Sequence, residues 1–458
     1  MALIEDARKI WEAGIAAVEP GGLVRRAVAR DGPVLRIQDR PYDLGSFENI
    51  FLLAFGKAAP AMAGAFLAAS GVRVRDGLVV ALPGSQVRIS GLRVLEAPHP
   101  LPDRRSVVAA EDALKLARAA GGKDLLVVLL SGGGSAQLCA PAEGLTLEEK
   151  TTVTRELLKR GAHIFELNAV RKHLSAVKGG RLAKAAAPAP AACLVISDVP
   201  GDDLGTIASG PVHWDASRYE DAGRVLEKYG LWAEGPPSVR RAIEEGRKGL
   251  RPETPKEGDP IFEKTTAHLL GTNATAVTAA AGEARSLGFR TVFMAAPDRG
   301  EARDVARRYA SVLRSVATSS RRGAAPLCFA GGGELTVTVK GKGKGGRNQE
   351  FVLAALAALE EWGFGEVDGG AGSDWLVASV GTDGIDGGTE AAGAWAGPET
   401  IAAATRLGLR AGPYLDDNDS YHYFQKAGGL VLTGPTGTNV MDLRLMLLGG
   451  PSRRPPSP

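Results

Sequence analysis

The fold class follows from LLVVLLSGGGSA, residues 125–136. Its first six residues are all leucine or valine, as expected for a strand that is buried on both faces. Directly after them come Ser131, Gly132, Gly133, Gly134 and Ser135. In open α/β sheets ligands bind at the carboxyl ends of strands, and the amides of such a glycine loop can surround phosphate oxygens. The loop therefore predicts a site for nucleotide phosphates; the alternative is an ordinary tight turn.

Short apolar runs alternate with alanine-rich amphipathic stretches along the rest of the chain. Strands are expected at FLLAF (51–55), CLVIS (193–197), HLLGT (268–272), TVFMA (291–295), LTVTV (335–339) and WLVASV (375–380). Helices are expected near 4–18, 58–69, 104–119, 146–160, 166–185, 273–287, 301–319 and 348–362. This alternation predicts an α/β fold with two Rossmann-like lobes, mostly parallel sheets and an interdomain cleft.

The domain boundary is expected at RPETPKEGDP, residues 251–260, where prolines and charges interrupt the periodic pattern. It separates an N-terminal α/β domain, residues 1–250, from a C-terminal α/β domain, residues 261–450. GFGEVDGGAGSD (363–374) is expected to be a surface loop, and PSRRPPSP (451–458) a disordered tail.

Composition excludes several classes of protein. Among 458 residues, Lys+Arg 55 against Asp+Glu 52 leaves a net charge of +3, and aromatic residues are only 5%, so nucleic-acid binding has no support. Cys139, Cys193 and Cys328 lie too far apart to indicate a zinc site or a disulfide framework. The acidic start and the absence of a long apolar run predict a cytoplasmic protein without membrane contact. Whether it forms a homo-oligomer stays open.

Two basic residues lie beside further glycine turns. Lys57 in AFGKAA follows a strand and precedes a helix, where it could hold a transferring phosphoryl group; a solvated surface lysine is the alternative. Arg347 in GKGKGGRNQE begins a helix, where its planar fork could grip a carboxylate or a phosphate. Pairing of Arg347 with Glu350 is the alternative there.

Two acidic loops also follow strands. Asp383 and Asp386 in GTDGIDG suit either a magnesium ion or a base that takes a hydroxyl proton, although acid-rich turns are common. Asp198 in ISDVPGDDLG stands nearest to a strand end and is the best residue of its loop for a site. The six histidines, His99 among them, lie at no metal-ligand spacing, and most are expected to be structural.

The glycines Gly341, Gly343 and Gly346 match G-x-G-x-x-G between an expected strand and a helix. This is a weak dinucleotide signal, because the expected acidic residue does not fall at the end of a second strand.

Six motifs in this order resemble a known family. They are SGGGSA (131–136), NAVRKHLSAVKGGRLA (168–183), ISDVPGDDLGTIASGP (196–211), GGGELTVTVKGKGKGGRNQE (331–350), GTDGIDG (381–387) and TGPTGTNVMDL (433–443). Together they resemble the class II glycerate 2-kinases, a two-domain family with a C-terminal MOFRL domain. The resemblance implies phosphorylation of D-glycerate with ATP and a divalent metal such as Mg²⁺, giving 2-phosphoglycerate.

The resemblance also assigns roles to residues. It implies that Lys57 and Arg347 are catalytic and contact the phosphoryl group or the glycerate carboxylate, and that the catalytic aspartate is Asp383 or Asp386. Asp198 is expected to bind substrate, and Asp383 and Asp386 are the candidates for the metal. Two other hypotheses stay open: an NAD(P)H-dependent hydroxypyruvate reductase, and a non-catalytic protein that binds a nucleotide or a sugar acid.

Overall fold

The computed structural model describes residues 2–294, 297–319, 325–364 and 374–449. They form two compact units: the first is Pro20–Leu270, and the second combines Met1–Glu19 with Gly271–Pro458. Most of the loop expected at 363–374, and the whole tail expected at 451–458, lie outside the described residues. Among the described helices, none combines the length and the apolar character that a membrane span needs.

The division between the units differs from the boundary expected at 251–260. That segment belongs to the first unit, because Glu253 accepts hydrogen bonds from His173 Nε2 (3.1 Å) and from the Tyr219 amide (2.8 Å). Thr254 Oγ1 donates to Asp215 at 3.0 Å. The expected N-terminal domain 1–250 also loses its first helix, since α1 (Ala2–Ala17) packs against a helix of the second unit. The structure therefore divides the chain after Leu270, ten residues beyond the expected segment, and assigns α1 to the second unit.

The first unit is built on a six-stranded sheet in the order β6-β5-β4-β7-β8-β9. Its strands are β4 (Asn49–Phe55), β5 (Asp76–Ala81), β6 (Arg93–Glu96), β7 (Asp124–Leu130), β8 (Ala191–Ile196) and β9 (Thr265–Gly271). β4 pairs in parallel with β5 and β7, as do β5 with β6 and β7 with β8. The expectation of a parallel sheet is therefore confirmed for this unit, and the carboxyl ends of β4 and β7 lie side by side.

Helices cover both faces of this sheet. α3 (Ala59–Ser70) and α4 (Arg104–Ala119) contact its strands, and α5 (Gly134–Gln137) and α8 (Arg181–Ala186) lie against α4. Leu53, Val80 and Val128 point to the face that α4 covers and join one buried core with its alanines. The strands are apolar at successive positions because both of their faces are covered.

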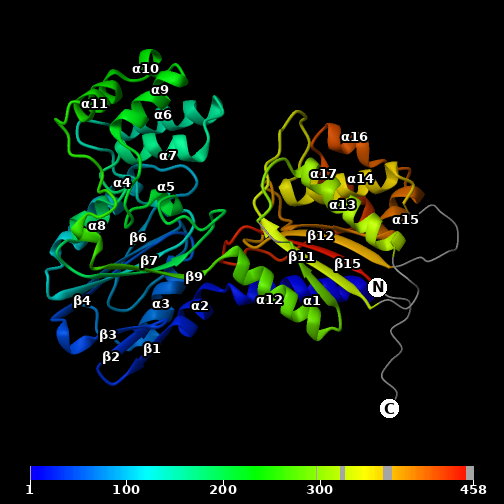
Figure 1. Ribbon diagram of the computed structural model, residues 1–458, viewed down its shortest axis with the longest axis horizontal. Coiled ribbons are helices and arrows are strands. Elements are labelled where there is room, and N and C mark those ends of the chain that lie inside the picture. Colours follow the sequence, from blue (N-terminus) through cyan, green and yellow to red (C-terminus); the bar gives the residue numbers. More distant parts are fainter. Residues whose placement is uncertain (1, 295–296, 320–324, 365–373, 450–458) are drawn as a thin grey trace. The chain divides into compact units, whose positions relative to one another are not determined.

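Smaller elements complete the first unit (Figure 1). A three-stranded antiparallel sheet contains β1 (Val28–Asp31), β2 (Val34–Ile37) and β3 (Arg40–Asp43). The other helices are α2 (Pro20–Ala27), α6 (Leu147–Lys159), α7 (Ile164–His173), α9 (Tyr219–Lys228), α10 (Leu231–Glu234) and α11 (Pro237–Arg247). The helix expected over 166–185 is thus two helices, α7 and α8, and the residue before α8 is Gly180, whose φ is 78°. Residues that carry a side chain rarely adopt that backbone conformation.

The second unit contains a six-stranded sheet in the order β10-β11-β15-β12-β13-β14. Its strands are β10 (Arg290–Phe293), β11 (Leu327–Gly333), β12 (Trp375–Gly381), β13 (Gly393–Ala396), β14 (Leu430–Val431) and β15 (Asp442–Leu448). Only the β10–β11 pair is parallel; β15 runs antiparallel to both β11 and β12, and β13 is antiparallel to its neighbours. The expectation of a mostly parallel sheet is wrong for this unit, because β15, the last strand in the sequence, lies antiparallel between β11 and β12.

Helices also cover both faces of the second sheet. α1 lies with α12 (Asn273–Ser286) on one face, while α13 (Ala302–Ser319) and α14 (Arg347–Glu361) lie on the other (Figure 1). The remaining helices are α15 (Pro398–Arg406), α16 (Ala411–Asp416) and α17 (Ser420–Ala427). The expected strand LTVTV at 335–339 does not form, and the strand of this region is β11. The segment 335–339 instead forms a loop, in which the Thr338 amide and hydroxyl donate to Glu301.

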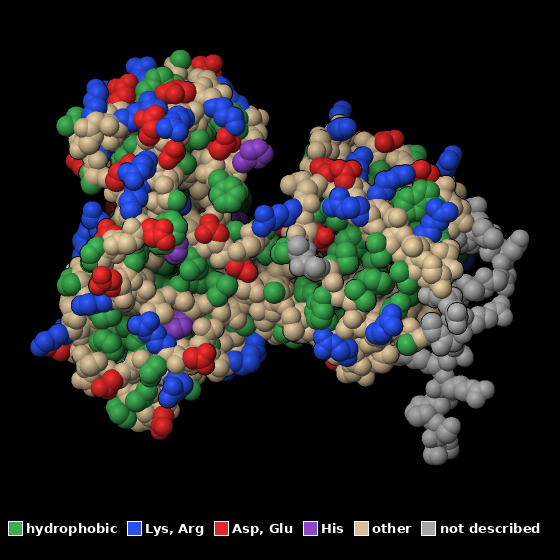
Figure 2. All heavy atoms as spheres, viewed as in Figure 1, with side chains coloured by type: hydrophobic (Ala, Val, Ile, Leu, Met, Phe, Trp, Pro, Cys, Tyr) green, Lys and Arg blue, Asp and Glu red, His purple; other side chains and the backbone are tan. Residues whose placement is uncertain are grey.

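The visible surface carries charges of both signs. Figure 2 shows lysines and arginines interspersed with aspartates and glutamates over each unit, in keeping with the near balance of charge in the sequence.

Candidate active site

The turns after β4 and β7 interlock in the first unit. The Lys57 amide donates to the Gly132 carbonyl at 2.8 Å, and the Ala58 amide donates to Ser131 Oγ at 3.0 Å. Gly56 has a φ of 108°, and a Cβ there would lie 2.3 Å from Ser131 Oγ. The close approach of the two turns therefore requires glycine at position 56, and it fixes Lys57 beside the glycine loop.

Side chains from three segments lie over that loop. A Cβ on Gly132 would lie 2.1 Å from the Asp198 Oδ2 atom, so the carboxyl group of Asp198 rests directly on this glycine. A Cβ on Gly133 would lie 3.1 Å from both Lys57 Cγ and His99 Cδ2. The structure thus brings Lys57, Asp198 and the loop together.

His99 is a neighbour that the sequence did not single out. Its ring lies against Gly133 although much of the residue is exposed. Desolvation of the ring, with a smaller effect of the Lys57 ammonium, lowers the pKa of His99 to about 4. A neutral imidazole beside the loop follows from this shift. The only sequence signal for His99 is its position shortly after the strand β6.

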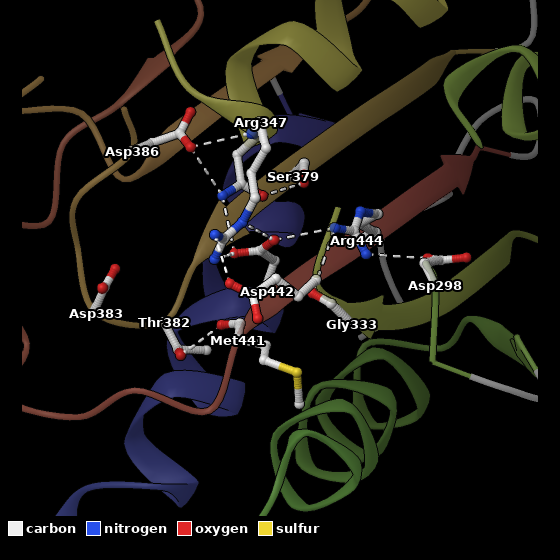
Figure 3. A network of polar contacts seen from close by, with 12 residues as sticks. Asp298, Gly333, Arg347, Ser379, Thr382, Asp383, Asp386, Met441, Asp442 and Arg444 are labelled. Carbon is white, nitrogen blue, oxygen red and sulfur yellow. Dashed lines mark hydrogen bonds and ion pairs between the residues drawn. The ribbon is translucent and has the colours of Figure 1, made fainter. Parts of the chain in front are cut away.

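Arg347 is the first residue of α14 in the second unit, and carboxylates hold its guanidinium. Its Nε donates to Asp442 Oδ2 at 2.7 Å and its Nη2 to Asp442 Oδ1 at 3.0 Å (Figure 3). Its Nη1 donates to Glu334 Oε1 at 2.8 Å. The arginine side chain is 31% exposed, whereas the Asp442 side chain is fully buried. Burial opposes the charge of Arg347, but Asp442 outweighs it and raises the pKa of the guanidinium. A permanently charged, preoriented cation results.

Asp386 caps the helix that Arg347 begins. Its carboxylate accepts hydrogen bonds from the amides of Asn348 (3.1 Å) and Gln349 (2.9 Å) and from both of their side-chain amides. The residue is 3% exposed, and burial raises its pKa to about 6 against the opposing effect of these donors. Each oxygen therefore already accepts two hydrogen bonds within the protein.

Asp383 stands differently on the same loop after β12. Its side chain is partly exposed, and Figure 3 shows it lying apart from the network around Arg347. Its Oδ1 accepts a hydrogen bond from the Ile385 amide at 3.2 Å, which orients the carboxylate. Of the two aspartates, Asp383 is the more exposed.

The sequence matches known proteins over almost its whole length. Residues 6–244 match a domain of unknown function, DUF4147, and residues 327–442 match the MOFRL family. The chain is 37% identical to a human glycerate kinase, over 98% of this chain and 94% of that protein. It is 38% identical to a glycerate 2-kinase of Pyrococcus horikoshii, over 96% of each chain. The chain belongs to the glycerate 2-kinase family with a C-terminal MOFRL domain. The crystal structure of glycerate kinase from Thermotoga maritima superposes on this member of the family with a TM-score of 0.83, at 39% identity, over 98% of this chain and 99% of the other.

This glycerate 2-kinase family member contains two further site residues that sequence reasoning missed, Asp442 and Arg444. Arg444 is fully buried on β15, where it donates to Asp442 and to Asp298, both at 3.1 Å. The motif TGPTGTNVMDL ends one residue after Asp442, yet the sequence suggested no role for it. A usable signal was present: an aspartate and an arginine two positions apart in an otherwise apolar strand must share one face of the sheet.

The dinucleotide fingerprint has a structural explanation in this family member. A Cβ on Gly341 would lie 2.2 Å from the Asp417 backbone, and one on Gly343 would lie 2.3 Å from Asp419 Cβ. Gly346 similarly lies against the carboxyl group of Asp386. The glycines therefore make room for neighbouring chain segments, and that chain fills the space where a pyrophosphate would have to approach.

Proposed function

We propose that this chain transfers the γ-phosphoryl group of ATP to the 2-hydroxyl of D-glycerate, which gives 2-phosphoglycerate and ADP. The observation that carries the proposal is a glycine loop with Lys57 fixed beside it, in a chain of the glycerate 2-kinase family. Phosphoryl transfer asks a protein mainly to position two reactants and to neutralise charge on the moving group.

The first unit offers parts suited to the nucleotide. We assign Ser131, Gly132, Gly133, Gly134 and Ser135 to the ATP phosphates. Lys57, whose side chain runs along Gly133, would neutralise the transferring phosphoryl group or hold the glycerate carboxylate. Asp198, in contact with Gly132, would orient a hydroxyl of the substrate.

Arg347 offers directed donors in the second unit. A guanidinium has five N–H groups, and Asp442 and Glu334 take three of those of Arg347 in the described part of the chain. One N–H on each terminal nitrogen remains, and each can donate to an oxygen of a carboxylate or a phosphoryl group. Arg347 would therefore bind the glycerate carboxylate or the phosphoryl group without needing to reorient.

Asp383 is our choice for the base that accepts the proton of the 2-hydroxyl as its oxygen attacks the γ-phosphorus. The bond from that phosphorus to the β,γ-bridging oxygen breaks, and ADP leaves with the bonding electrons. Asp386 has its oxygens engaged in capping α14, which favours Asp383 for both base and metal contacts. Mg²⁺ would enter as the nucleotide complex, since the described residues hold no cluster of three metal-binding side chains.

The test is to incubate the protein with MgATP and D-glycerate and to identify the product by phosphorus NMR. We expect phosphate on C2, confirmed when enolase alone consumes the product. An exclusively C3 product would remove the 2-kinase assignment and leave a kinase. A protein that binds ATP without turnover would instead be a binding protein.

A second candidate has one observation in its favour: a relative in Agrobacterium vitis, 38% identical over 96% of this chain, is named "Putative hydroxypyruvate reductase". The packing of Gly341 and Gly343 against Asp417 and Asp419 argues against a dinucleotide there. Oxidation of NADPH by hydroxypyruvate, followed at 340 nm in the same preparation, decides the question.

A further inference from the structure

The hydroxyl of Ser135, at the end of the glycine loop, is surrounded by cations. The Lys178 ammonium donates to Ser135 Oγ and to the Ser135 carbonyl, both at 2.6 Å, and the Arg171 guanidinium also donates to Oγ. Because Oγ accepts two charged donors, its own proton points to Ser209 Oγ at 3.0 Å. Ser209 in turn donates to Asn168 Oδ1 at 3.1 Å. The hydroxyl protons of Ser135 and Ser209 are thus both directed away from the cations.

The two cations have no carboxylate partner. In the described residues neither Arg171 nor Lys178 forms an ion pair, whereas the neighbouring Lys172 is paired with Asp215 at 3.1 Å. Lys178 is only 1% exposed. Its burial, with the charge of Arg171, lowers the pKa of the ammonium well below its usual value. Buried charges in proteins are normally paired, so these two lack a negative counterpart.

Unused donors surround the same place. Asn168 is 3% exposed, and its side-chain nitrogen has no hydrogen-bond partner among the described residues. Of the five N–H groups of Arg171, one is used by a described residue, Ser135. Within the described chain, the amides of Gly132 and Gly133 take no part in the loop's backbone hydrogen bonds. An excess of donors with no acceptor points to an anionic ligand that supplies several acceptor oxygens.

A cavity next to Asn168 indicates which anion this is. It has a volume of about 380 Å³ and is also lined by Phe165, Thr206, His213 and Trp214. The rings of His213 and Trp214 are 4.9 Å apart, and Phe165 is 70% exposed. Ligand pockets of this size hold molecules much larger than a three-carbon acid, and aromatic walls suit a purine.

We propose that Arg171 and Lys178 bind a phosphate of the nucleotide at Ser135, with the nucleoside in the cavity lined by Phe165 and Trp214. The inference rests on the proposed function and extends it, because it places both ends of the nucleotide on residues of the first unit. The orientation proposed for the nucleotide follows from Asn168, which lines the cavity and is joined through Ser209 to the site of Arg171 and Lys178. D-glycerate, whose carboxylate is also an oxyanion, is the competing occupant.

The experiment measures binding without turnover, by calorimetry at pH 7.5 with three probes: ATP, inorganic tripolyphosphate and D-glycerate. Arg171→Gln and Lys178→Met should each weaken ATP and tripolyphosphate by about 30-fold or more and change glycerate affinity less than about threefold. Phe165→Ala should weaken ATP by about tenfold and leave tripolyphosphate unchanged, because that probe has no nucleoside. Lys150→Met is the matched control, since it removes another buried ammonium, one that donates to the Leu174 carbonyl. Its charge acts on Lys178 without contacting Ser135, so it should change the affinity for each probe less than Arg171→Gln and Lys178→Met do.

Loss of glycerate affinity with unchanged ATP affinity would overturn the proposal in favour of the substrate carboxylate. Unchanged affinity for all three probes in a folded Arg171→Gln protein would overturn it altogether. Circular dichroism checks folding, and Arg171→Lys provides a second variant if Lys178→Met does not fold. Because no step needs phosphoryl transfer, a protein that binds ATP but does not phosphorylate glycerate would overturn the proposed function and leave this inference standing.

Discussion

The carboxylate of Asp442 holds the guanidinium of Arg347 in two parallel hydrogen bonds, from Nε to Oδ2 at 2.7 Å and from Nη2 to Oδ1 at 3.0 Å. Asp442 also accepts from Arg444 at 3.1 Å and from the Asn348 side chain at 3.0 Å. One buried carboxylate therefore serves two arginines, and it joins the first residue of α14 to the central strand β15. This relationship governs what substitution of either residue does.

Asp442→Asn should destabilise the protein strongly. The amide keeps the shape of the side chain but removes the charge between Arg347 and Arg444, and breaking a buried ion pair costs about 3–5 kcal/mol. Urea denaturation measures the loss. Glu334→Gln is the control, because Glu334 binds the same arginine but is 40% exposed, and a pair of this kind contributes about 1 kcal/mol or less. Equal losses in the two variants would contradict this account.

Lys57→Ala should lose activity and keep its fold. Lys57 is partly exposed beside the glycine loop, and removing a fixed charge aimed at the transition state costs about 10²- to 10³-fold in kcat. The melting temperature should change little. The exposed Lys184 of the same unit provides the control variant, Lys184→Ala, which should keep full activity. A Lys57→Ala enzyme with more than about a third of wild-type kcat/KM would refute the role in phosphoryl transfer, since that loss is under roughly 1 kcal/mol.

Replacing each aspartate of GTDGIDG by asparagine should have different effects on activity and on stability. Asp383→Asn should lower kcat by about 10²-fold or more with an unchanged melting temperature, because an amide cannot accept the hydroxyl proton. Asp386→Asn should instead destabilise the protein by about 1–3 kcal/mol, because its new N–H group would face the donors of Asn348 and Gln349. Steady-state kinetics and thermal denaturation of both variants give the comparison. Loss of kcat without loss of stability in Asp386→Asn would reverse the assignment.

The sequence predicted the first unit better than the second, and the reason lies in how each site is assembled. Lys57, the glycine loop and Asp198 all follow predicted buried strands, so the parallel order of β4, β7 and β8 places them at one edge of the sheet. Local patterns are sufficient there. The cations Arg171 and Lys178 come instead from α7 and the turn before α8, and no local pattern reports that their side chains converge on Ser135.

In the second unit the decisive contacts are distant along the chain. Arg347 and Asp442 are separated by 95 positions, and they meet because β15 enters the centre of the sheet antiparallel to its neighbours. The run DLRLMLL was not predicted as a strand, since its aspartate and arginine are unusual in a buried run. Their pairing with Arg347 and Asp298 compensates for that burial, and only the tertiary structure shows it.

Gly133→Val should raise the KM for ATP by about tenfold or more. Gly133 has a φ of 87°, and a side chain there would collide with Lys57 and His99 and block the loop amides. Gly84→Val separates the steric effect from backbone strain, because Gly84 has a φ of 76° but an open surrounding. Both variants should lose some stability, and only Gly133→Val should lose ATP affinity. If a folded Gly133→Val protein keeps its ATP affinity, the loop is only a turn.

The difference in stability between the wild type and Lys150→Met should depend on pH in a defined direction. Burial lowers the pKa of Lys150 to about 8 from its ordinary 10.5. Between these two values the unfolded chain holds a proton that the folded chain has released, so the free energy of unfolding rises with pH through this window. At about 1.4 kcal/mol per pKa unit, the wild type should gain at most about 3 kcal/mol over the variant between pH 7.5 and pH 10.5. Urea midpoints at four pH values measure the gain, and the other titrating groups are common to both proteins. A difference that stays constant over this range would mean that Lys150 titrates alike in the folded and unfolded chains, and a difference that moves toward the variant would mean that its folded pKa is raised.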